Sequence, residues 1–475
     1  MNNVHRVLAA GLGKVVSTQW VYVLLLMAIC SQHQSCSKKV APFEPTDALG
    51  RANQWVYDSL RLYYYWSDQL NKHPDYSLAT PEFFRSLLAP ADRFSAITNN
   101  RDVQPHRSVY EWYGLYYSLV THPFDAQRLV GVVTFVLPGS TAAQYLERGD
   151  LFTQVNGRKL GKDNVEEISR QFTDGDAVTL MKAVINDQGT QLTDKAAVSV
   201  TGGGVPFQTI YTARAFERNG IRTGYLSYLQ CIESQDYRVL DAMLRFKQAG
   251  VTELILDLRF NPGGSVASCA KLAAMLVPNY QPGQTFVTFQ GNRSGGTVKQ
   301  SFEKTISFSA TAPGKTPQEL LLRNLNLKRI FILTSGATIS AAEILCNNLK
   351  PFMQVVRVGG KTYGKDEASF RIEDKRSPKQ IPWILYPIVY KIADANGKGN
   401  YSSGLLPDHA VNEFSRLPLM PLGLPGDPLL DQALLLIYQS TDVGVTPMRK
   451  KTYVFTGLKE VYYSADNATG VEFQH

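Results

Sequence analysis

Ser340 is the first residue whose type and position could carry chemistry. It lies in the sequence TISAAE, which is separated by three residues from the preceding apolar run RIFILT. A serine between a buried strand and a helix sits at the carboxyl end of a sheet, where α/β proteins bind ligands. The N–H of Ala341 would then face outward at a helix N-terminus, where it can stabilise an oxyanion. The pattern Ser-x-x-Glu, completed by Glu343, is also a capping box, and alone it favours that structural role.

Lys365 closes the glycine-rich run GGKTYGK, which follows another strand pattern. A lysine acts as a general base only if burial or a nearby cation lowers its pKa by several units from about 10.4. A serine hydroxyl needs such a base to attack a carbonyl near neutral pH. Considered alone, Lys365 is more typical of a solvated lysine in a turn.

Gly263 and Gly264 end a third segment, ELILDLRFNPGG. Paired glycines let the backbone approach a ligand closely, with N–H groups free to point at it. Either N–H could supply a second donor to an oxyanion, and a plain turn between a strand and a helix is the alternative. The segment is not a phosphate loop, because no Gly-Lys-Ser/Thr follows.

Alternating strand and helix patterns surround these segments and predict an α/β core. A long, polar, glycine-rich stretch at 279–327 is expected to cover or frame the site. The expected strands lie at 223–229, 253–258, 329–334, 355–358 and within 383–392, and the expected helices at 237–249, 341–349 and 429–438.

Two smaller regions precede the core. Residues 45–98 show aromatic and apolar residues at roughly helical spacing, which predicts a small helical region. Residues 108–200 carry strand patterns, with a tight-turn signal at Asn156-Gly157.

Composition excludes several classes of protein. A chain of 475 residues is too long for one hydrophobic core. Its composition, with 44% hydrophobic and 19% charged residues, is typical of globular domains. The net charge of +8 is not gathered in long Lys/Arg runs, so nucleic-acid binding is not expected. Cys231, Cys269 and Cys346 lie in apolar stretches without metal-like spacing, so we expect buried free thiols and neither metal nor cofactor.

The N-terminus has the pattern of a secretory signal peptide. Arg6 and Lys14 precede an apolar run at 20–30 that is too short to span a bilayer comfortably. The following SCSKK resembles the lipidated start of bacterial lipoproteins, which favours lipidation at Cys36 over Cys30. We therefore expect an exported protein of a Gram-negative bacterium, either periplasmic or an outer-membrane-anchored lipoprotein. Ordinary cleavage to a soluble periplasmic protein is the alternative.

Taken together, the three motifs resemble the C-terminal processing, or tail-specific, serine protease family, in a lipoprotein form as in Bacteroidetes. LILDLR-x-NPGG, LTSG-x-T-x-SA-x-E and G-x-x-TYGK occur in order, and GLLPD at 404–408 and DPLL at 427–430 also fit. The resemblance implies a Ser-Lys dyad without a cofactor. Its residues would be Ser340 as nucleophile, Lys365 as base, Ala341 with Gly263 or Gly264 as oxyanion donors, and Glu343 and Thr362 in support.

Two positions depart from that family's pattern. Many members carry Gln four residues after the lysine, where this chain has Ser369. Some carry Asp eleven residues after the serine, where this chain has Pro351. Ser369 could still orient the lysine, more weakly.

The runs PGSTAA at 138–143 and GDLFTQVNG at 149–157 resemble a PDZ domain. Such domains bind a peptide by adding it to a sheet edge and capturing its C-terminal carboxylate. A structural β domain without a ligand is the alternative. The corresponding carboxylate loop would consist of Tyr113, Gly114, Leu115 and Tyr116.

These observations combine into one predicted architecture. It has a signal peptide at 1–35, a tether and helical region at 36–105, a PDZ-like domain at 106–202 and a catalytic domain at 203–475. The resemblance implies an α/β fold with a crotonase-like spiral core.

The predicted function is a serine endopeptidase that acts on proteins or peptides with free C-termini and is held to the membrane by a lipid anchor. The main alternative is a catalytically silent PDZ-containing binding lipoprotein. A carbohydrate-active enzyme is disfavoured, because no paired-carboxylate motif is present.

Overall fold

The computed structural model describes residues 47–99, 107–205, 208–307, 316–439 and 451–464. The predicted signal peptide and the predicted lipidation at Cys36 or Cys30 lie outside these residues. No helix in the described ranges is long and apolar enough to cross a membrane.

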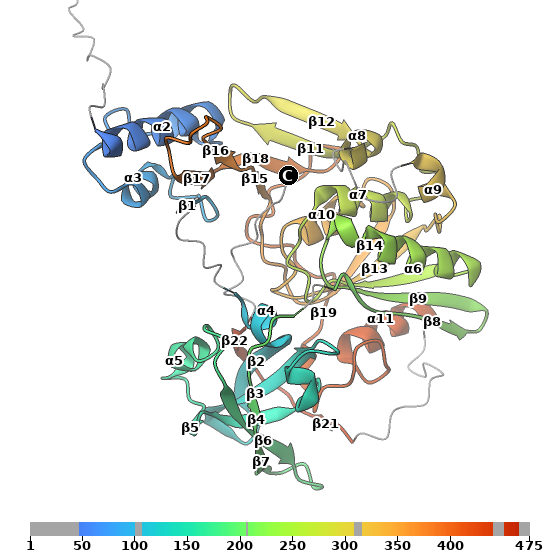
Figure 1. Ribbon diagram of the computed structural model, residues 1–475. Helices are drawn as coiled ribbons and strands as arrows, with labels where there is room; N and C mark the ends of the chain where they lie inside the picture. Colours follow the sequence, from blue (N-terminus) through green and yellow to red (C-terminus); the bar gives the residue numbers. More distant parts are fainter. Residues whose placement is uncertain (1–46, 100–106, 206–207, 308–315, 440–450, 465–475) are drawn as a thin grey trace, which may run out of the picture. The chain divides into compact units, whose positions relative to one another are not determined.

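A six-stranded sheet lies at the centre of the part of the chain from residue 208 to residue 439 (Figure 1). Its order is β19-β14-β13-β10-β9-β8, parallel from β19 to β9, with β8 antiparallel to β9. The inner strands are short apolar runs, as expected for strands buried on both faces. The strands are β8 Ile210–Arg218, β9 Ile221–Tyr228, β10 Glu253–Asp257, β13 Arg329–Thr334, β14 Gln354–Gly359 and β19 His409–Ala410.

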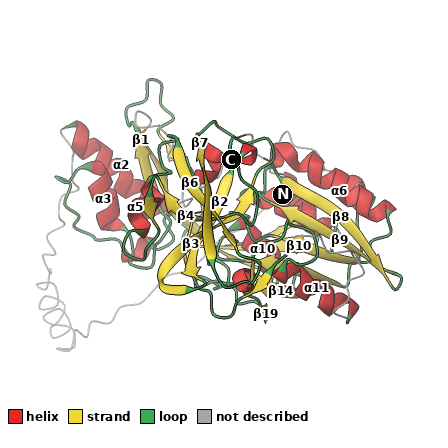
Figure 2. Ribbon diagram, turned by 90° about the horizontal axis from the view of Figure 1, so that it is seen from below, coloured by secondary structure: helices red, strands yellow, loops and turns green. Residues whose placement is uncertain are grey.

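Helices cover both faces of this sheet. Leu254 and Leu256 of β10 face one group of helices, whereas Ile255 faces α11, because side chains alternate along a strand. Figure 2 shows α6 and α11 on opposite sides of the strands. The predicted core strands and helices are confirmed to within two residues at their ends. The helices are α6 Asp236–Gln248, α7 Val266–Ala274 and α10 Ala341–Asn348 on the first face and α11 Pro428–Tyr438 on the second.

The polar stretch predicted at 279–327 contains a β-hairpin and two short helices. The hairpin joins a second sheet of order β12-β11-β18-β15. Because β15 begins just after Lys365, this sheet adjoins the predicted site. The elements are β11 Thr285–Gly291, β12 Thr297–Ser301, α8 Phe302–Ser307, α9 Pro317–Leu321, β15 Glu367–Ser369 and β18 Ile388–Ala393.

The helical region predicted at 45–98 is confirmed except at its end. Its aromatic residues pack into one cluster with Leu385, which comes from far along the chain. Residues 96–99 form a strand instead of a helix, because they pair antiparallel with β17. The elements are α2 Ala48–Tyr63, η1 Ser67–Gln69, α3 Thr80–Leu87, β1 Ala96–Asn99, β16 Ile372–Glu373 and β17 Trp383–Tyr386.

Residues 108–200 form a strand-rich domain around their own hydrophobic core. The tight turn predicted at Asn156-Gly157 is confirmed, since both residues have positive φ, 47° and 77°, between β4 and β5. The elements are α4 Val109–Tyr113, β2 Leu115–His122, β3 Asp125–Val136, η2 Ala142–Gln144, β4 Leu151–Val155, β5 Arg158–Lys159, α5 Val165–Arg170, β6 Val178–Ile185 and β7 Leu192–Val200.

The sheet of this domain also contains a strand from the other end of the chain. β22 (Glu460–Tyr463) pairs with β2, which the sequence did not predict. Just before it, β21 (Tyr453–Val454) pairs with β20 (Arg416–Leu417). The mixed α/β fold is therefore confirmed, whereas the crotonase-like spiral, the PDZ assignment and the domain boundaries stay predictions.

A buried ion network joins the strand-rich domain to the central sheet. The guanidinium of Arg259, which is fully buried, contacts Asp257 at 2.9 Å, Asp427 at 2.9 Å and Glu413 at 2.9 Å. Arg148 of the strand-rich domain contacts Glu413 at 2.5 Å and Asp427 at 3.4 Å. Asp427 also caps the N-terminus of α11. The network therefore connects the strand-rich domain to a helix that packs on the central sheet.

Arg259→Met is expected to lower the free energy of unfolding by about 3–5 kcal/mol, because it leaves buried carboxylates without their main partner. Urea unfolding followed by circular dichroism measures this change. The matched control is Arg329→Met, since Arg329 pairs with Glu253 on neighbouring strands but is 35% exposed. The control should cost less than about 1 kcal/mol. Equal effects of the two substitutions would contradict a special role for the network.

Candidate active site

Ser340 stands at the N-cap position of α10, immediately after the loop that leaves β13. Its backbone is unusual for a residue with a side chain, with φ 54° and ψ −117°. Such conformations cost about 1–3 kcal/mol and persist where surrounding contacts hold them. Ser340 is only 2% exposed. The N-cap position expected from the sequence is confirmed, and the strain marks Ser340 as more than an ordinary cap.

The carboxylate of Glu343 joins the serine segment to the lysine segment. Its Oε2 accepts hydrogen bonds from the backbone N–H of Ser340 (2.9 Å) and of Lys365 (2.8 Å). Its Oε1 accepts from the hydroxyl of Thr362 (2.6 Å) and the N–H of Gly364 (2.8 Å). One oxygen atom thus holds residues 340 and 365 side by side. Burial raises the pKa of Glu343, and the hydrogen bonds from these donors oppose that rise.

Lys365 lies in an environment that disfavours its charge. It is 7% exposed, and burial lowers the pKa of its ammonium, whereas Glu367 and Glu343 oppose that shift. Its Nζ lies 5.0 Å from the centre of the Phe94 ring. Phe94 also contacts the ring of Tyr363, with centroids 6.1 Å apart. The N-terminal region therefore supplies part of the cover over the lysine.

Glu367 is the acidic neighbour that the sequence did not identify. Its carboxylate is bound by Lys391, which also contacts Asp366 at 2.9 Å. Because Lys391 offsets part of the charge of these two carboxylates, Glu367 attracts the proton of Lys365 less than a lone carboxylate would. Phe94 meets Lys365 only through tertiary structure, whereas Glu367 is two residues away in the sequence but belongs to no motif.

The glycine pair lies against the serine. Both glycines have positive φ, 103° at Gly263 and 127° at Gly264. A Cβ on Gly263 would lie 2.9 Å from the Ala341 nitrogen and 3.0 Å from the Cβ of Ser340, so no side chain fits there. The N–H of Gly263 donates to the side chain of Asn261 at 2.8 Å. Within the described residues, the N–H groups of Ala341 and Gly264 have no hydrogen-bond partner.

Ser369, the predicted orienting residue, lies at the end of β15 and pairs with Ile388 of β18. In the part of the chain that the structure describes, its hydroxyl makes no hydrogen bond to Lys365 or to any other residue. Its role as a third member stays a prediction. Pro351, at the other departure from the pattern, follows the far end of α10.

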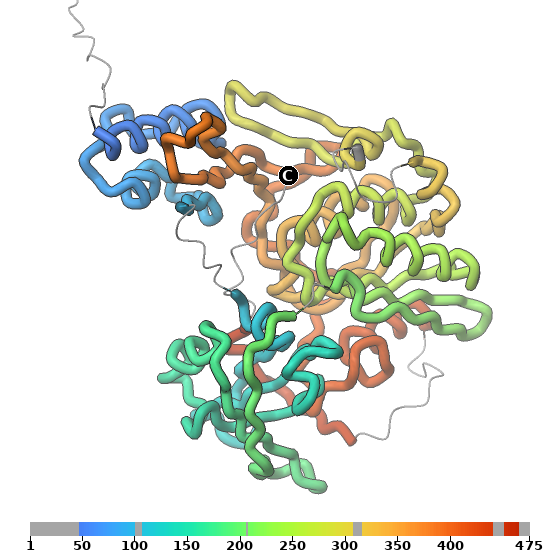
Figure 3. The backbone as a smooth tube through the Cα atoms, viewed as in Figure 1, coloured from blue at the N-terminus to red at the C-terminus, as the bar shows by residue number. Residues whose placement is uncertain are grey.

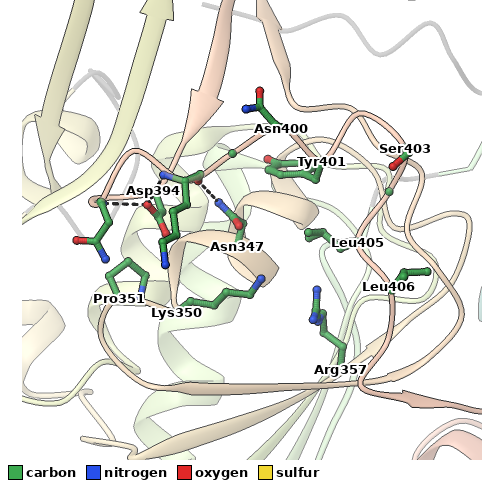
Figure 4. Close-up of a pocket in the computed structure, with 14 residues that line it drawn as sticks. Asn347, Lys350, Pro351, Arg357, Asp394, Asn400, Tyr401, Ser403, Leu405 and Leu406 are labelled. Carbon is green, nitrogen blue, oxygen red and sulfur yellow. Dashed lines mark hydrogen bonds between the residues drawn. The ribbon is translucent and has the colours of Figure 1, made fainter.

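A cavity of about 450 Å³ lies beside that far end of α10 (Figure 4). It is polar, with Lys350, Arg357 and Asp394 in its wall, and the Asn347 side chain donates to the Lys398 carbonyl at 2.8 Å. Neither Ser340 nor Lys365 lines it. Its wall includes Leu405, whose N–H donates to the Thr362 hydroxyl at 2.7 Å, so the cavity adjoins the support of the site but is not lined by the proposed dyad.

The predicted carboxylate loop of the strand-rich domain lies between α4 and β2. Gly114 ends α4 in a left-handed conformation, with φ 68°, and β2 begins at the next residue. Tyr113 and Leu115 are fully buried, so their side chains belong to the core, and only backbone atoms could meet a carboxylate. Tyr116 packs toward the central sheet, with its ring 6.1 Å from that of Phe260.

Comparison with known proteins covers both parts of this site. The sequence model of peptidase family S41 matches residues 222–411, which include the serine, lysine and glycine segments. The model of the peptidase S41 N-terminal domain matches residues 51–96, which include Phe94.

Individual relatives agree with these matches. A carboxyl-terminal-processing protease of Picosynechococcus sp. is 25% identical over 291 residues, 61% of this chain and 58% of that protein. One of Synechocystis sp. is 25% identical over 198 residues, 41% of this chain and 39% of that protein. The matches thus span less than two thirds of the length of these relatives.

A solved structure from Bacteroides fragilis, assigned to the S41 proteases, superposes with a TM-score of 0.65 at 24% identity. It covers 84% of this chain and 98% of that one, which shows a shared fold. The family models match on both sides of the strand-rich domain, and they identify residues 51–96 and 222–411 as segments of peptidase family S41.

Proposed function

We propose that this chain is a serine endopeptidase of the C-terminal processing type, with Ser340 as nucleophile and Lys365 as general base. The observation that carries the proposal is the Glu343 carboxylate, which binds the backbone N–H of both residues through one oxygen. This shared contact supports the proposal, because a serine nucleophile needs its base within reach.

In the proposed reaction, the neutral amine of Lys365 takes the proton of the Ser340 hydroxyl while the Ser340 Oγ attacks the scissile carbonyl. The N–H groups of Ala341 and Gly264 stabilise the oxyanion of the tetrahedral intermediate. The Lys365 ammonium then protonates the leaving amine as the C–N bond breaks. Water, deprotonated by the same amine, hydrolyses the acyl-serine and restores both residues.

Gly263 serves a different purpose in this proposal. Its N–H is held by Asn261, and its bare Cα lets the loop lie against Ser340. This contact supports Gly264 in place of Gly263 as the second oxyanion donor.

The strand-rich domain is proposed to be a PDZ-like module that binds the C-terminal tail of a protein or peptide substrate along β2. The left-handed turn at Gly114 supports this assignment by its position directly before β2, where the carboxylate loop of a PDZ domain is expected, although the Gly114 N–H itself donates to the Tyr110 carbonyl. The sequence pattern of residues 1–36 predicts export, so the substrates would be envelope or secreted proteins.

Ser340→Ala and Lys365→Ala are each expected to lower kcat/KM by at least about 1000-fold, because each removes one member of the dyad. Cleavage of an unfolded protein by the chain lacking residues 1–40 measures this, with products followed by mass spectrometry. Equal cleavage by all three proteins would contradict the dyad. No cleavage by the parent would favour the catalytically silent binding lipoprotein.

Phe94→Ala is expected to shift the pH profile of kcat/KM to higher pH. Water reaching Lys365 would raise its pKa toward the usual value, and a base must be unprotonated to act. A rise of one unit lowers the rate about tenfold below both midpoints and leaves the plateau at high pH unchanged. Phe94→Leu, which keeps an apolar cover, is the matched control. A decrease in kcat/KM of equal size at every pH would refute the role of Phe94 in lowering the pKa of Lys365.

Glu343→Gln is expected to lower the free energy of unfolding by about 2–4 kcal/mol and kcat/KM by at least about 100-fold, since an amide cannot accept hydrogen bonds at both ends. The matched control is Glu319→Gln, the capping-box glutamate of α9, whose hydrogen bonds are exposed. The control should change stability by less than about 1 kcal/mol and leave kcat/KM unchanged. Similar results for both variants would contradict the bridging role.

A further inference from the structure

The C-terminal strand β22 occupies the outer edge of β2 (Figure 1). The pairing is antiparallel, with Ser118 opposite Tyr463 and Leu119 opposite Tyr462. The backbone N–H of Thr121 donates to the Lys459 carbonyl at 2.9 Å. Figure 3 shows the red C-terminal trace running beside the blue-green strands of the domain. The edge that the proposed peptide would use is therefore already filled by this chain.

The contacts continue through Ser464, the last described residue. Its N–H donates to the Tyr117 carbonyl at 3.0 Å, and its hydroxyl accepts from the Tyr117 N–H at 2.9 Å. Ser464 is fully buried. Since β22 is antiparallel to β2, the chain runs here toward the turn at Gly114. A peptide whose C-terminal carboxylate reaches that turn would run in the same direction.

Two aromatic side chains anchor the strand. The Tyr462 ring lies 5.8 Å from that of Tyr117 and packs on the core of the strand-rich domain, which includes Phe172 beyond α5. The Tyr463 ring lies 5.8 Å from that of Tyr116 and is 8% exposed. These are the contacts of a bound peptide: backbone pairing for affinity and alternate side chains for specificity.

We propose that residues 459–464 are a tethered, displaceable occupant of the peptide edge of β2, which competes with the tails of substrates. The proposal rests on the peptide-binding role suggested above. Strand β2 has one row of N–H and C=O groups on this edge, so only one segment can pair with it at a time. A competing tail would be an extended peptide with aromatic residues at the positions of Tyr462 and Tyr463.

Replacement of β22 by another peptide would also affect the loop that follows Phe260. Tyr463 contacts Tyr116, whose ring is stacked on Phe260 with centroids 6.1 Å apart and planes at 17°. Phe260 precedes Asn261, the residue that holds the N–H of Gly263. A different side chain at the position of Tyr463 thus acts, through two rings, on the loop that carries Gly264, one of the two proposed oxyanion donors.

Covalent attachment sets how strongly the occupant competes. The occupant is joined directly to the segment that carries β21, which pairs with β20, so its competition with a free peptide is intramolecular. The apparent dissociation constant of a free peptide equals its intrinsic value divided by the fraction of molecules whose edge is open. Weakening β22 therefore raises the affinity for a free peptide, without any new contact to it.

The test measures binding of a fluorescein-labelled peptide with the sequence of residues 457–464, GLKEVYYS, by fluorescence anisotropy. The parent is the otherwise full chain carrying Ser340→Ala, so that the peptide is not cleaved. Tyr462→Ala/Tyr463→Ala removes both anchors. Ser464→Pro removes the N–H and hydroxyl that pair with Tyr117 but keeps every aromatic side chain. Val461→Ala is the matched control, because Val461 lies on the same strand and is 44% exposed.

The double variant and Ser464→Pro are expected to bind the peptide at least tenfold more tightly than the parent, and Val461→Ala the same as the parent. Circular dichroism checks that each variant is folded. If the double variant or Ser464→Pro is unstable, the other one is sufficient for the test. If neither variant binds the peptide more tightly than the parent, the proposal is overturned and β22 is a permanent strand of the sheet. Since no cleavage is measured, a failure of the Ser-Lys dyad leaves this result unaffected, and a failure here leaves the dyad assays unaffected.

Discussion

The buried carboxylate of Glu343 is the interaction on which the rest of the site depends. It accepts hydrogen bonds from the backbone at Ser340, Gly364 and Lys365 and from the Thr362 hydroxyl. A buried carboxylate is tolerated only when its oxygens accept hydrogen bonds. Glu343 therefore needs these four donors, and the donors need its carboxylate as their acceptor. The arrangement fixes the start of α10 relative to the loop after β14. It also lets Ser340 keep a strained backbone, because the surrounding contacts hold it there.

A second constraint acts at the other end of the glycine segment. Arg259 lies in the buried network with Asp257, Glu413 and Asp427, and two residues later Asn261 holds the loop that passes Ser340. Arg148 brings the strand-rich domain into the same network. The proposed peptide edge of β2 and the glycine loop beside Ser340 are thus joined through this network, and the stack of Tyr116 on Phe260 runs beside it. A change at the edge of β2 therefore has a physical path to the proposed site.

The environment of Lys365 is assembled from distant parts of the chain. Phe94 covers it from the N-terminal region, while Lys391 binds the nearby carboxylates of Asp366 and Glu367. Burial lowers the pKa of the lysine and outweighs the opposing effect of Glu367 and Glu343. This arrangement explains how a residue that is typical of a solvated turn when considered alone becomes suited to take a proton.

The sequence by itself determined the local elements and the order of the motifs. Strand β13 and helix α10 follow from apolar runs and periodicity, and the turn at Asn156-Gly157 follows from the backbone freedom of those two residues. Only the tertiary structure decided the cover of Phe94, the pairing of β1, and the placement of β22 on β2. The reason is physical: a short strand has no preference of its own for a partner, and its pairing is set by contacts between segments that lie far apart in the chain.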